Sequence, residues 1–283
     1  MIIQDKILSG ERPLYGSRDL RLERVTIGEG ESALKECSHI EAHECEIQGM
    51  YVFWECEDVE CRNCRFASSD RAPLWYGKNI RMHDCIMDAP KVFRELDGLT
   101  LENIQISDGA EAFWYCKNGH LSDLNMQRAE YAFMQSSKLQ INNLTLQGKY
   151  TFQYARNIEI HNAVLDTKDA FWNSEDCTIY DSDVKGEYLG WYARNLRLVR
   201  CRISGTQPLC YCENLILEDC TFAPNADLAF EHSSVQATIL SAVTSIINPK
   251  SGRIQCQSIG EFIHNADAKT PDDCQVISFA ERS

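Results

Sequence analysis

The sequence predicts an all-β protein: a right-handed parallel β-helix of about eleven or twelve coils, with three short strands per coil. An apolar position recurs every 19 to 21 residues, and Asn or Asp returns shortly after it in nearly every repeat. An aromatic motif follows later in the repeat and places all five tryptophans of the chain at one position. Repeats of about this length, with like residues at like positions, are typical of solenoids.

The first strand of each coil is predicted by apolar residues that alternate with polar ones, as in a strand with one buried face. The most regular apolar position holds Leu22, Ala42, Cys61, Met82, Leu101, Leu121, Ile141, Ile160, Ile179, Leu198, Leu217 and Ala237. A bend is expected two residues later, because Asn and Asp tolerate the left-handed conformation that a tight bend requires. The bend residues are Asn63, Asp84, Asn103, Asp123, Asn143, Asn162, Asp181 and Asp219.

The second strand of each coil begins directly after this bend, and cysteine is frequent at its first position. That position holds Cys45, Cys64, Cys85, Cys201 and Cys220, and a separate one holds Cys37, Cys56, Cys116 and Cys212. Small thiols on successive coils can pack as a ladder, so we expect reduced structural cysteines. The Cys61-x-x-Cys64 pair resembles half of a zinc site, but no second pair has the matching spacing. No metal site and no cofactor is therefore predicted.

The third strand is expected to carry the aromatic motif. One of its positions is almost uniformly apolar and should face the core: Leu34, Phe53, Leu74, Phe93, Phe113, Phe133, Phe152, Phe171, Leu209 and Phe230. By alternation, the next position faces outward. An aromatic stripe of Trp54, Trp75, Trp114, Trp172 and Trp191, flanked by Tyr76 and Tyr115, is therefore predicted on the surface.

The whole chain, residues 1–283, is expected to form a single β-helix domain. Residues 19–245 hold the regular coils. Because an open coil exposes strand edges and its own core, both ends need covering. Residues 1–18 break the pattern and are interpreted as an N-terminal cap, and residues 246–283 as an irregular C-terminal coil and tail.

The repeat resembles the pectin-lyase-like superfamily of β-helices, and in particular a short-coil bacterial family known only as a domain of unknown function. The segments Phe113-Trp114-Tyr115-Cys116, Asn195-Leu196-Arg197-Leu198 and Leu217-Glu218-Asp219-Cys220-Thr221-Phe222 carry the resemblance, which covers roughly residues 19 to 245. The resemblance implies the fold. It implies no particular function, because this fold supports lyases, hydrolases and non-catalytic binders.

Composition limits the partners. The chain has 28 Lys and Arg against 42 Asp and Glu, a net charge of −14, which would repel nucleic acids and anionic membrane surfaces. The first ten residues lack the apolar core of a signal peptide, and no segment reaches the roughly 18 to 20 apolar residues of a membrane span. A cytoplasmic protein without nucleic-acid or membrane partners is therefore expected.

The predicted function is binding of a carbohydrate or another extended ligand along the aromatic stripe, since exposed aromatic patches usually make contacts. The alternative is a non-catalytic scaffold, or a protein that associates with itself through the stripe. A further alternative is a polysaccharide lyase or glycoside hydrolase, for which Arg94, Glu95 and Glu111 are the catalytic candidates. Arg94 could instead be a cation–π partner of the neighbouring indoles.

Overall fold

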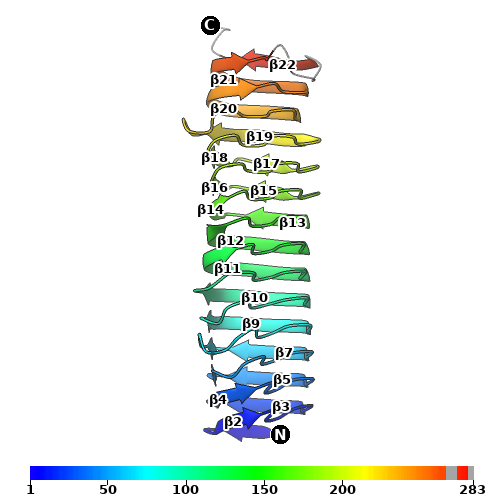
Figure 1. The fold of residues 1–283 in the computed structure, drawn as a ribbon, viewed down its shortest axis with the longest axis vertical. Helices are drawn as coiled ribbons and strands as arrows, with labels where there is room; N and C mark the ends of the chain where they lie inside the picture. Colours follow the sequence, from blue (N-terminus) through cyan, green and yellow to red (C-terminus); the bar gives the residue numbers. More distant parts are fainter. Residues whose placement is uncertain (266–272, 280–283) are drawn as a thin grey trace. The chain divides into compact units, whose positions relative to one another are not determined.

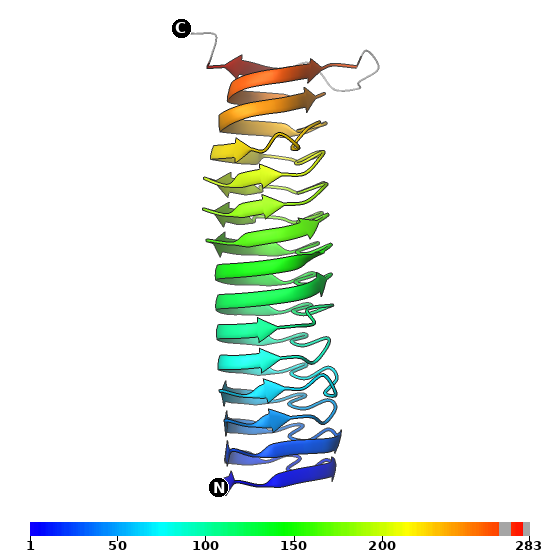
Figure 2. The ribbon, with the colours of Figure 1, turned by 90° about the vertical axis from the view of Figure 1, so that its left-hand side faces the viewer.

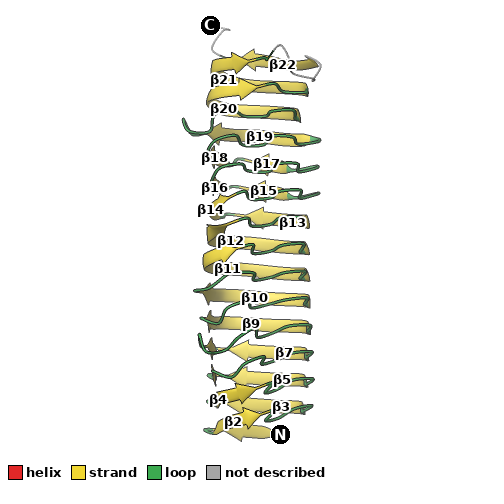
Figure 3. Ribbon diagram, viewed as in Figure 1, coloured by secondary structure: helices red, strands yellow, loops and turns green. Residues whose placement is uncertain are grey.

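The computed structural model describes residues 1–265 and 273–279, and these residues contain strands and turns but no helix (Figure 3). The chain divides into two compact units, Met1–Gln147 and Gly148–Ser283. In both units the strands pair in parallel with strands one coil away, as Figures 1 and 2 show. The chain therefore folds as a right-handed parallel β-helix, as predicted.

The first unit contains two series of parallel strands. One series is β1, β3, β5, β7, and the other is β2, β4, β6, β8; both continue into β9, which pairs with β10, and β10 pairs with β11. The strands are β1 (Ile2–Gln4), β2 (Ile7–Glu11), β3 (Arg18–Glu23), β4 (Thr26–Glu31), β5 (Ser38–His43), β6 (Glu46–Ile47), β7 (Glu57–Arg62), β8 (Arg65–Phe66), β9 (Lys78–Met87), β10 (Asp97–Ile106), β11 (Lys117–Glu130) and β12 (Ser137–Lys149), the last of which extends past this unit.

The second unit repeats this arrangement. Strands β13, β15 and β17 form one series, β14, β16 and β18 the other, and both continue into β19, which is followed in turn by β20, β21 and β22. The strands are β13 (Arg156–His161), β14 (Val164–Lys168), β15 (Thr178–Tyr180), β16 (Asp183–Lys185), β17 (Arg197–Val199), β18 (Arg202–Ser204), β19 (Leu215–Phe222), β20 (Ser234–Ile247), β21 (Ser251–Ile263) and β22 (Asp273–Ser278).

The described residues form about 14 turns, more than the eleven or twelve expected. The additional turns lie in the two terminal segments. In residues 1–18, Ile3 of β1 pairs with Leu22, so the inward column extends into the segment interpreted as a cap. In residues 246–283, β21 and β22 continue the parallel pairing. The terminal segments thus take the form of further coils, because their backbones pair in register even where their apolar pattern is weak. Whether the chain acts as one domain stays a prediction.

The third side of the coil differs from the expected strand. Its residues form turns, with only isolated bridges such as Trp75 to Arg94 and Arg94 to Trp114. Alternate residues have positive φ, including Glu111 (57°), Phe113 (62°) and Tyr115 (58°). A left-handed conformation costs roughly 1 to 2 kcal/mol for a residue with a Cβ, so burial of the aromatic ring must offset this cost. Side chains do not alternate strictly here: Ala112 and Phe113 are both buried, Trp114 is half-buried and Tyr115 is exposed. The predicted inward position of Phe113 is nevertheless found.

The aromatic core column is fully buried, as the alternation predicts. Phe93, Phe113 and Phe133 are each 0% exposed. Their rings stack on successive coils, with centroids 4.8 Å apart for Phe93 and Phe113 and 4.5 Å apart for Phe113 and Phe133. In the second unit, Phe152 and Phe171 stack in the same way at 4.7 Å. The coil repeat thus places identical rings at contact distance.

The predicted bend residues adopt the left-handed conformation. Asn63, Asp84 and Asn103 have φ values of 51°, 55° and 54°. Their side chains also connect coils, since the amide of Asn103 donates to Asp84 Oδ1 at 2.6 Å. Asn and Asp therefore have two roles at these bends: their backbones adopt the left-handed conformation, and their side chains form hydrogen bonds between coils.

All fourteen cysteines lie in the described residues and are free thiols; thirteen of them are buried and Cys274 is half-buried. Most of the thiols donate to a backbone carbonyl of the neighbouring coil, as Cys116 does to Phe93 O at 3.3 Å. Burial raises the pKa of Cys116 to about 12. A thiol that is protonated and shielded from solvent is a poor nucleophile.

The carboxyl group of Asp70 is buried and lacks a hydrogen-bond partner of standard geometry. Asp70 lies in the turn after β8 and is 0% exposed, and neither of its carboxyl oxygens makes a hydrogen bond of standard geometry. Burial raises the pKa of Asp70 well above its ordinary value, and the backbone N–H of Arg71 offsets this only in part. Burial therefore favours the neutral form of Asp70.

Candidate ligand-binding surface

The predicted outward aromatic residues of the first unit form a tryptophan row, defined here as Trp54, Trp75, Arg94 and Trp114. All four side chains are half-buried. The indoles of Trp54 and Trp75 stack at 5.2 Å with an interplanar angle of 6°. The Arg94 guanidinium lies between two indoles, 4.6 Å from the Trp75 centroid and 4.3 Å from that of Trp114. Arg94 thus continues the stack as a cation–π partner.

The indole N–H groups of the row are satisfied within the protein. Trp54, Trp75 and Trp114 each donate to a backbone carbonyl of the next coil, at 2.6 Å in every case. These bonds fix the rings in place while their faces cover one another or Arg94. The row therefore offers ring edges to a ligand. That these tryptophans bind a ligand stays a prediction, and such a ligand would contact either the indole edges or the residues beside the row.

The tyrosines beside the row are oriented differently. Tyr76 and Tyr115 are 41% and 43% exposed. The Tyr76 ring stands at 86° to the indole of Trp75, and the Tyr115 ring at 84° to that of Trp114. A ring perpendicular to the stacked indoles does not turn its face toward the coils above and below. Because Glu95 occupies the same position on the intervening coil, the two tyrosines lie about 9.6 Å apart along the stacking direction.

A shallow, open depression of about 350 Å³ lies beside Tyr115, lined by that residue with Glu95, Leu96 and Lys117. Lys117 lies 3.3 Å from Asp97 Oδ2. The Asn118 side chain donates to Asp97 Oδ1 at 2.6 Å and lowers the pKa of Asp97, an effect that Lys117 reinforces against burial. Sequence reasoning missed Lys117 and Asp97. Each lies two residues after the position that holds Tyr115 in one coil and Glu95 in the preceding coil, and this shared spacing could have identified them.

The catalytic candidates are only partly brought together. Arg94 lies 3.7 Å from Glu111, and Lys91 donates to Glu111 at 2.9 Å. Glu111 is therefore engaged by two cations, and Arg94 by two indoles. Glu95 lies apart from them on the exposed side, in the depression. In the described residues, no three His, Cys, Asp or Glu side chains are placed to hold a metal ion.

The aromatic residues of the second unit form a separate cluster. Trp172 and Trp191 are half-buried, with centroids 5.7 Å apart at an angle of 43°. Here the neighbouring tyrosines stack on each other, Tyr192 on Tyr211 at 4.9 Å and 16°. The Tyr211 hydroxyl donates to Glu231, and burial together with this bond raises the pKa of Tyr211 to about 12. The faces of these tyrosines are thus partly used within the cluster.

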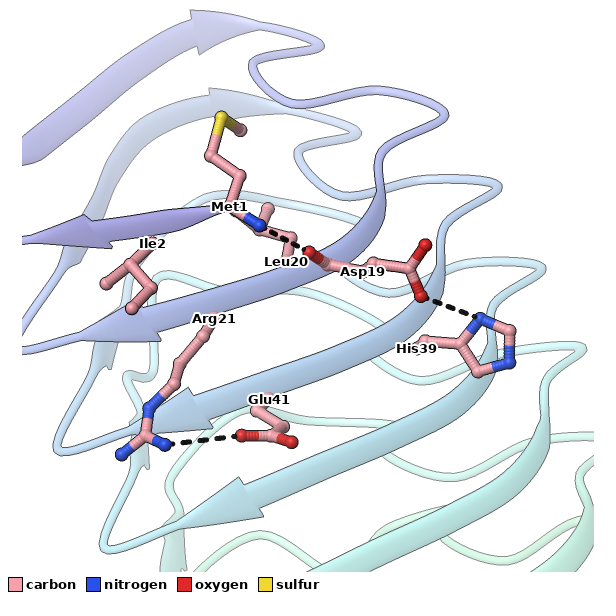
Figure 4. A pocket seen from close by; sticks show the side chains of 7 residues that line it. All are labelled: Met1, Ile2, Asp19, Leu20, Arg21, His39 and Glu41. Carbon is pink, nitrogen blue, oxygen red and sulfur yellow. Dashed lines mark hydrogen bonds and ion pairs between the residues drawn. The ribbon is translucent and has the colours of Figure 1, made fainter.

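A second open depression, of about 310 Å³, lies at the N-terminal coils (Figure 4). Its polar groups are paired among themselves. The Met1 amine donates to Asp19 O at 2.7 Å, His39 lies 3.5 Å from Asp19, and Arg21 lies 3.7 Å from Glu41 (Figure 4). This depression lacks the exposed aromatic faces found beside the tryptophan row.

No curated protein matches the sequence. Among solved structures, the A-module of the Azotobacter vinelandii mannuronan C-5 epimerase AlgE4 aligns over 78% of this chain and 83% of its own, with 11% identity and a TM-score of 0.41. PfbA, a surface adhesin of Streptococcus pneumoniae, aligns over 93% and 86%, with 9% identity and a TM-score of 0.41. The tailspike protein of E. coli bacteriophage HK620, in complex with a pentasaccharide, aligns over 96% and 70%, with 10% identity and a TM-score of 0.35.

The described ranges include no helix that is long and apolar enough to cross a membrane. A family match extends over residues 1–277, almost the whole sequence. The chain therefore belongs to the family described as "Protein of unknown function (DUF3737)".

Proposed function

We propose that the protein binds an extended carbohydrate on the tyrosine surface of its first unit, defined as Tyr76, Glu95, Tyr115 and Lys117. The observation that carries the proposal is the orientation of Tyr76 and Tyr115, exposed and nearly perpendicular to the indoles behind them. An aromatic face that is free of intramolecular stacking can stack on the apolar face of a sugar ring.

The polar groups of the surface suit the same ligand. Glu95 can accept hydrogen bonds from sugar hydroxyls, and the Lys117 ammonium can donate to them. The depression is open and shallow, which favours a chain that lies across the coils over a small molecule enclosed in a pocket. The indoles behind the tyrosines are fixed by their N–H bonds, so each tyrosine ring lies against a rigid neighbour.

Binding without chemistry is favoured by the state of the catalytic candidates. Arg94 is only 17% exposed and lies between two indoles, and Glu111 is paired with Arg94 and Lys91. A general acid or base needs access to the proton it transfers. Neither side chain reaches the exposed tyrosine faces without breaking these contacts. Glu95 is the one candidate in the depression, and among the described residues it has no second candidate carboxylate beside it there.

The test is a screen of oligosaccharides on a glycan array, followed by calorimetry on the best binder. Tyr115→Ala should weaken binding by about 1 to 3 kcal/mol, or about 5- to 150-fold, on the scale of aromatic stacking with other planar ligands. Tyr115→Phe keeps the ring and should retain most of the affinity.

Tyr192→Ala is the positional control. Tyr192 is 44% exposed at the same place in its coil, but its ring stacks on Tyr211 at 4.9 Å and lies in the separate aromatic cluster of the second unit. Its loss should leave binding unchanged. The proposal fails if no oligosaccharide binds, or if Tyr115→Ala binds as the unsubstituted protein does. Loss of self-association in Tyr115→Ala, seen by sedimentation without any glycan binding, would support the scaffold alternative instead.

A further inference from the structure

The charges around the tyrosine surface are arranged in compensating pairs. The parallel register of β9, β10 and β11 aligns Lys78 with Asp97 and Asp97 with Lys117. Asp97 therefore lies between two lysines on consecutive coils. Together with Glu95, these residues form a group of two positive and two negative side chains, Lys78, Lys117, Asp97 and Glu95, whose formal charges sum to zero.

The central acid of this group stays ionised. Asn118 donates a hydrogen bond to Asp97, and Lys117 and Lys78 stabilise the carboxylate, so the pKa of Asp97 is lowered. Lys117 lies 3.3 Å from the Asp97 carboxylate. An anionic group on a ligand would have to compete with Asp97 for this lysine.

The preceding coil adds no uncompensated positive charge. Glu57 aligns with Lys78 on the preceding coil, and Glu55 there is paired with Lys35 at 3.5 Å. The whole chain carries a net charge of −14. A polyanionic chain would thus meet lysines already paired with acids, on a protein that repels it.

We infer that the ligand of the tyrosine surface is a neutral oligosaccharide, and that Asp97 is the residue that discriminates against acidic sugars. This inference rests on the proposed function. In it, sugar rings stack on Tyr76 and Tyr115, and the paired charges exchange hydrogen bonds with hydroxyl groups. Asp97 excludes sugar acids because it neutralises Lys78 and Lys117.

The experiment compares three hexasaccharides of equal length by calorimetry: a neutral hexose chain, a hexuronate chain and a hexosamine chain. The neutral chain should bind most tightly, with an affinity that stays nearly constant between about 20 mM and about 500 mM salt, since screening acts on charged pairs. Tighter binding of the hexuronate, or tighter binding of the cationic hexosamine at low salt, would overturn the inference.

Asp97→Asn is the decisive variant, because it leaves Lys78 and Lys117 uncompensated. It should strengthen hexuronate binding about fivefold, and this gain should disappear at high salt. Asp84→Asn is the matched control. Asp84 also accepts a side-chain amide bond, from Asn103 at 2.6 Å, but sits at the other bend of its coil, so hexuronate binding should not change.

The outcomes separate the two claims. Unchanged hexuronate affinity in a folded Asp97→Asn protein would refute the role of Asp97 while leaving carbohydrate binding intact. If Asp97→Asn does not fold, the ligand series and its salt dependence in the unsubstituted protein still decide the matter. Absence of binding for all three hexasaccharides and on the array would refute the proposed function itself.

Discussion

Truncation of a single core ring tests whether the phenylalanine column stabilises the coils. Phe113 is 0% exposed, and its ring is stacked between Phe93 at 4.8 Å and Phe133 at 4.5 Å. Phe113→Ala removes the transfer energy of a fully buried ring and leaves a cavity between two rings held by their own coils. The free energy of unfolding should fall by about 3 to 5 kcal/mol, toward the upper end because two stacking partners are lost. Urea unfolding followed by circular dichroism gives this value.

The neighbouring residue provides the control. Trp114 lies on the same coil but is half-buried, so Trp114→Ala loses part of its apolar contact, one hydrogen bond to Tyr131 and the contact with Arg94. These losses sum to roughly 2 kcal/mol. Equal losses at the two positions, or a larger loss for Trp114→Ala, would refute the facing and the energetic argument together.

Three further predictions address thiols, pH and the tryptophan row. Thiol titration of the native protein should find few reactive groups, and denaturation should release all fourteen; many reactive thiols before unfolding would contradict their burial. Because the pKa of Asp70 is raised on folding, the unfolded state releases this proton first, so stability should fall as pH rises above 3.8 toward the raised value. Asp70→Asn should remove that decline and raise Tm at neutral pH; an unchanged pH profile would count against it. Arg94→Lys should lower the free energy of unfolding by about 0.5 to 1 kcal/mol, because lysine lacks the planar group that stacks between indoles. Tryptophan fluorescence should change as well. If neither the free energy of unfolding nor the fluorescence changes, the cation–π stack is refuted.

The repeat made most of the fold predictable. A shift of one residue in register would move all side chains of a strand to the opposite face. Only one register therefore buries the apolar residues, and the inward columns through Leu22 and Phe113 could be assigned from their spacing. The left-handed bends at Asn63 and Asp84 followed from residue type. The terminal coils were harder to recognise, since backbone pairing there does not depend on a strong apolar pattern.

The sequence by itself determined which side chains face the core, where the coils bend and which residues share a surface, because all three depend on local periodicity. Tertiary structure decided what that surface offers. The sequence pattern places Trp75 and Trp114 on the surface. In the structure, Trp54 and Arg94 cover the faces of Trp75, and Arg94 covers one face of Trp114. Tyr115 stands at 84° to Trp114 and is 43% exposed, and Lys117 is paired with Asp97 from the adjacent coil. Such contacts depend on ring orientation and on distances between residues about twenty positions apart, which a sequence pattern does not specify.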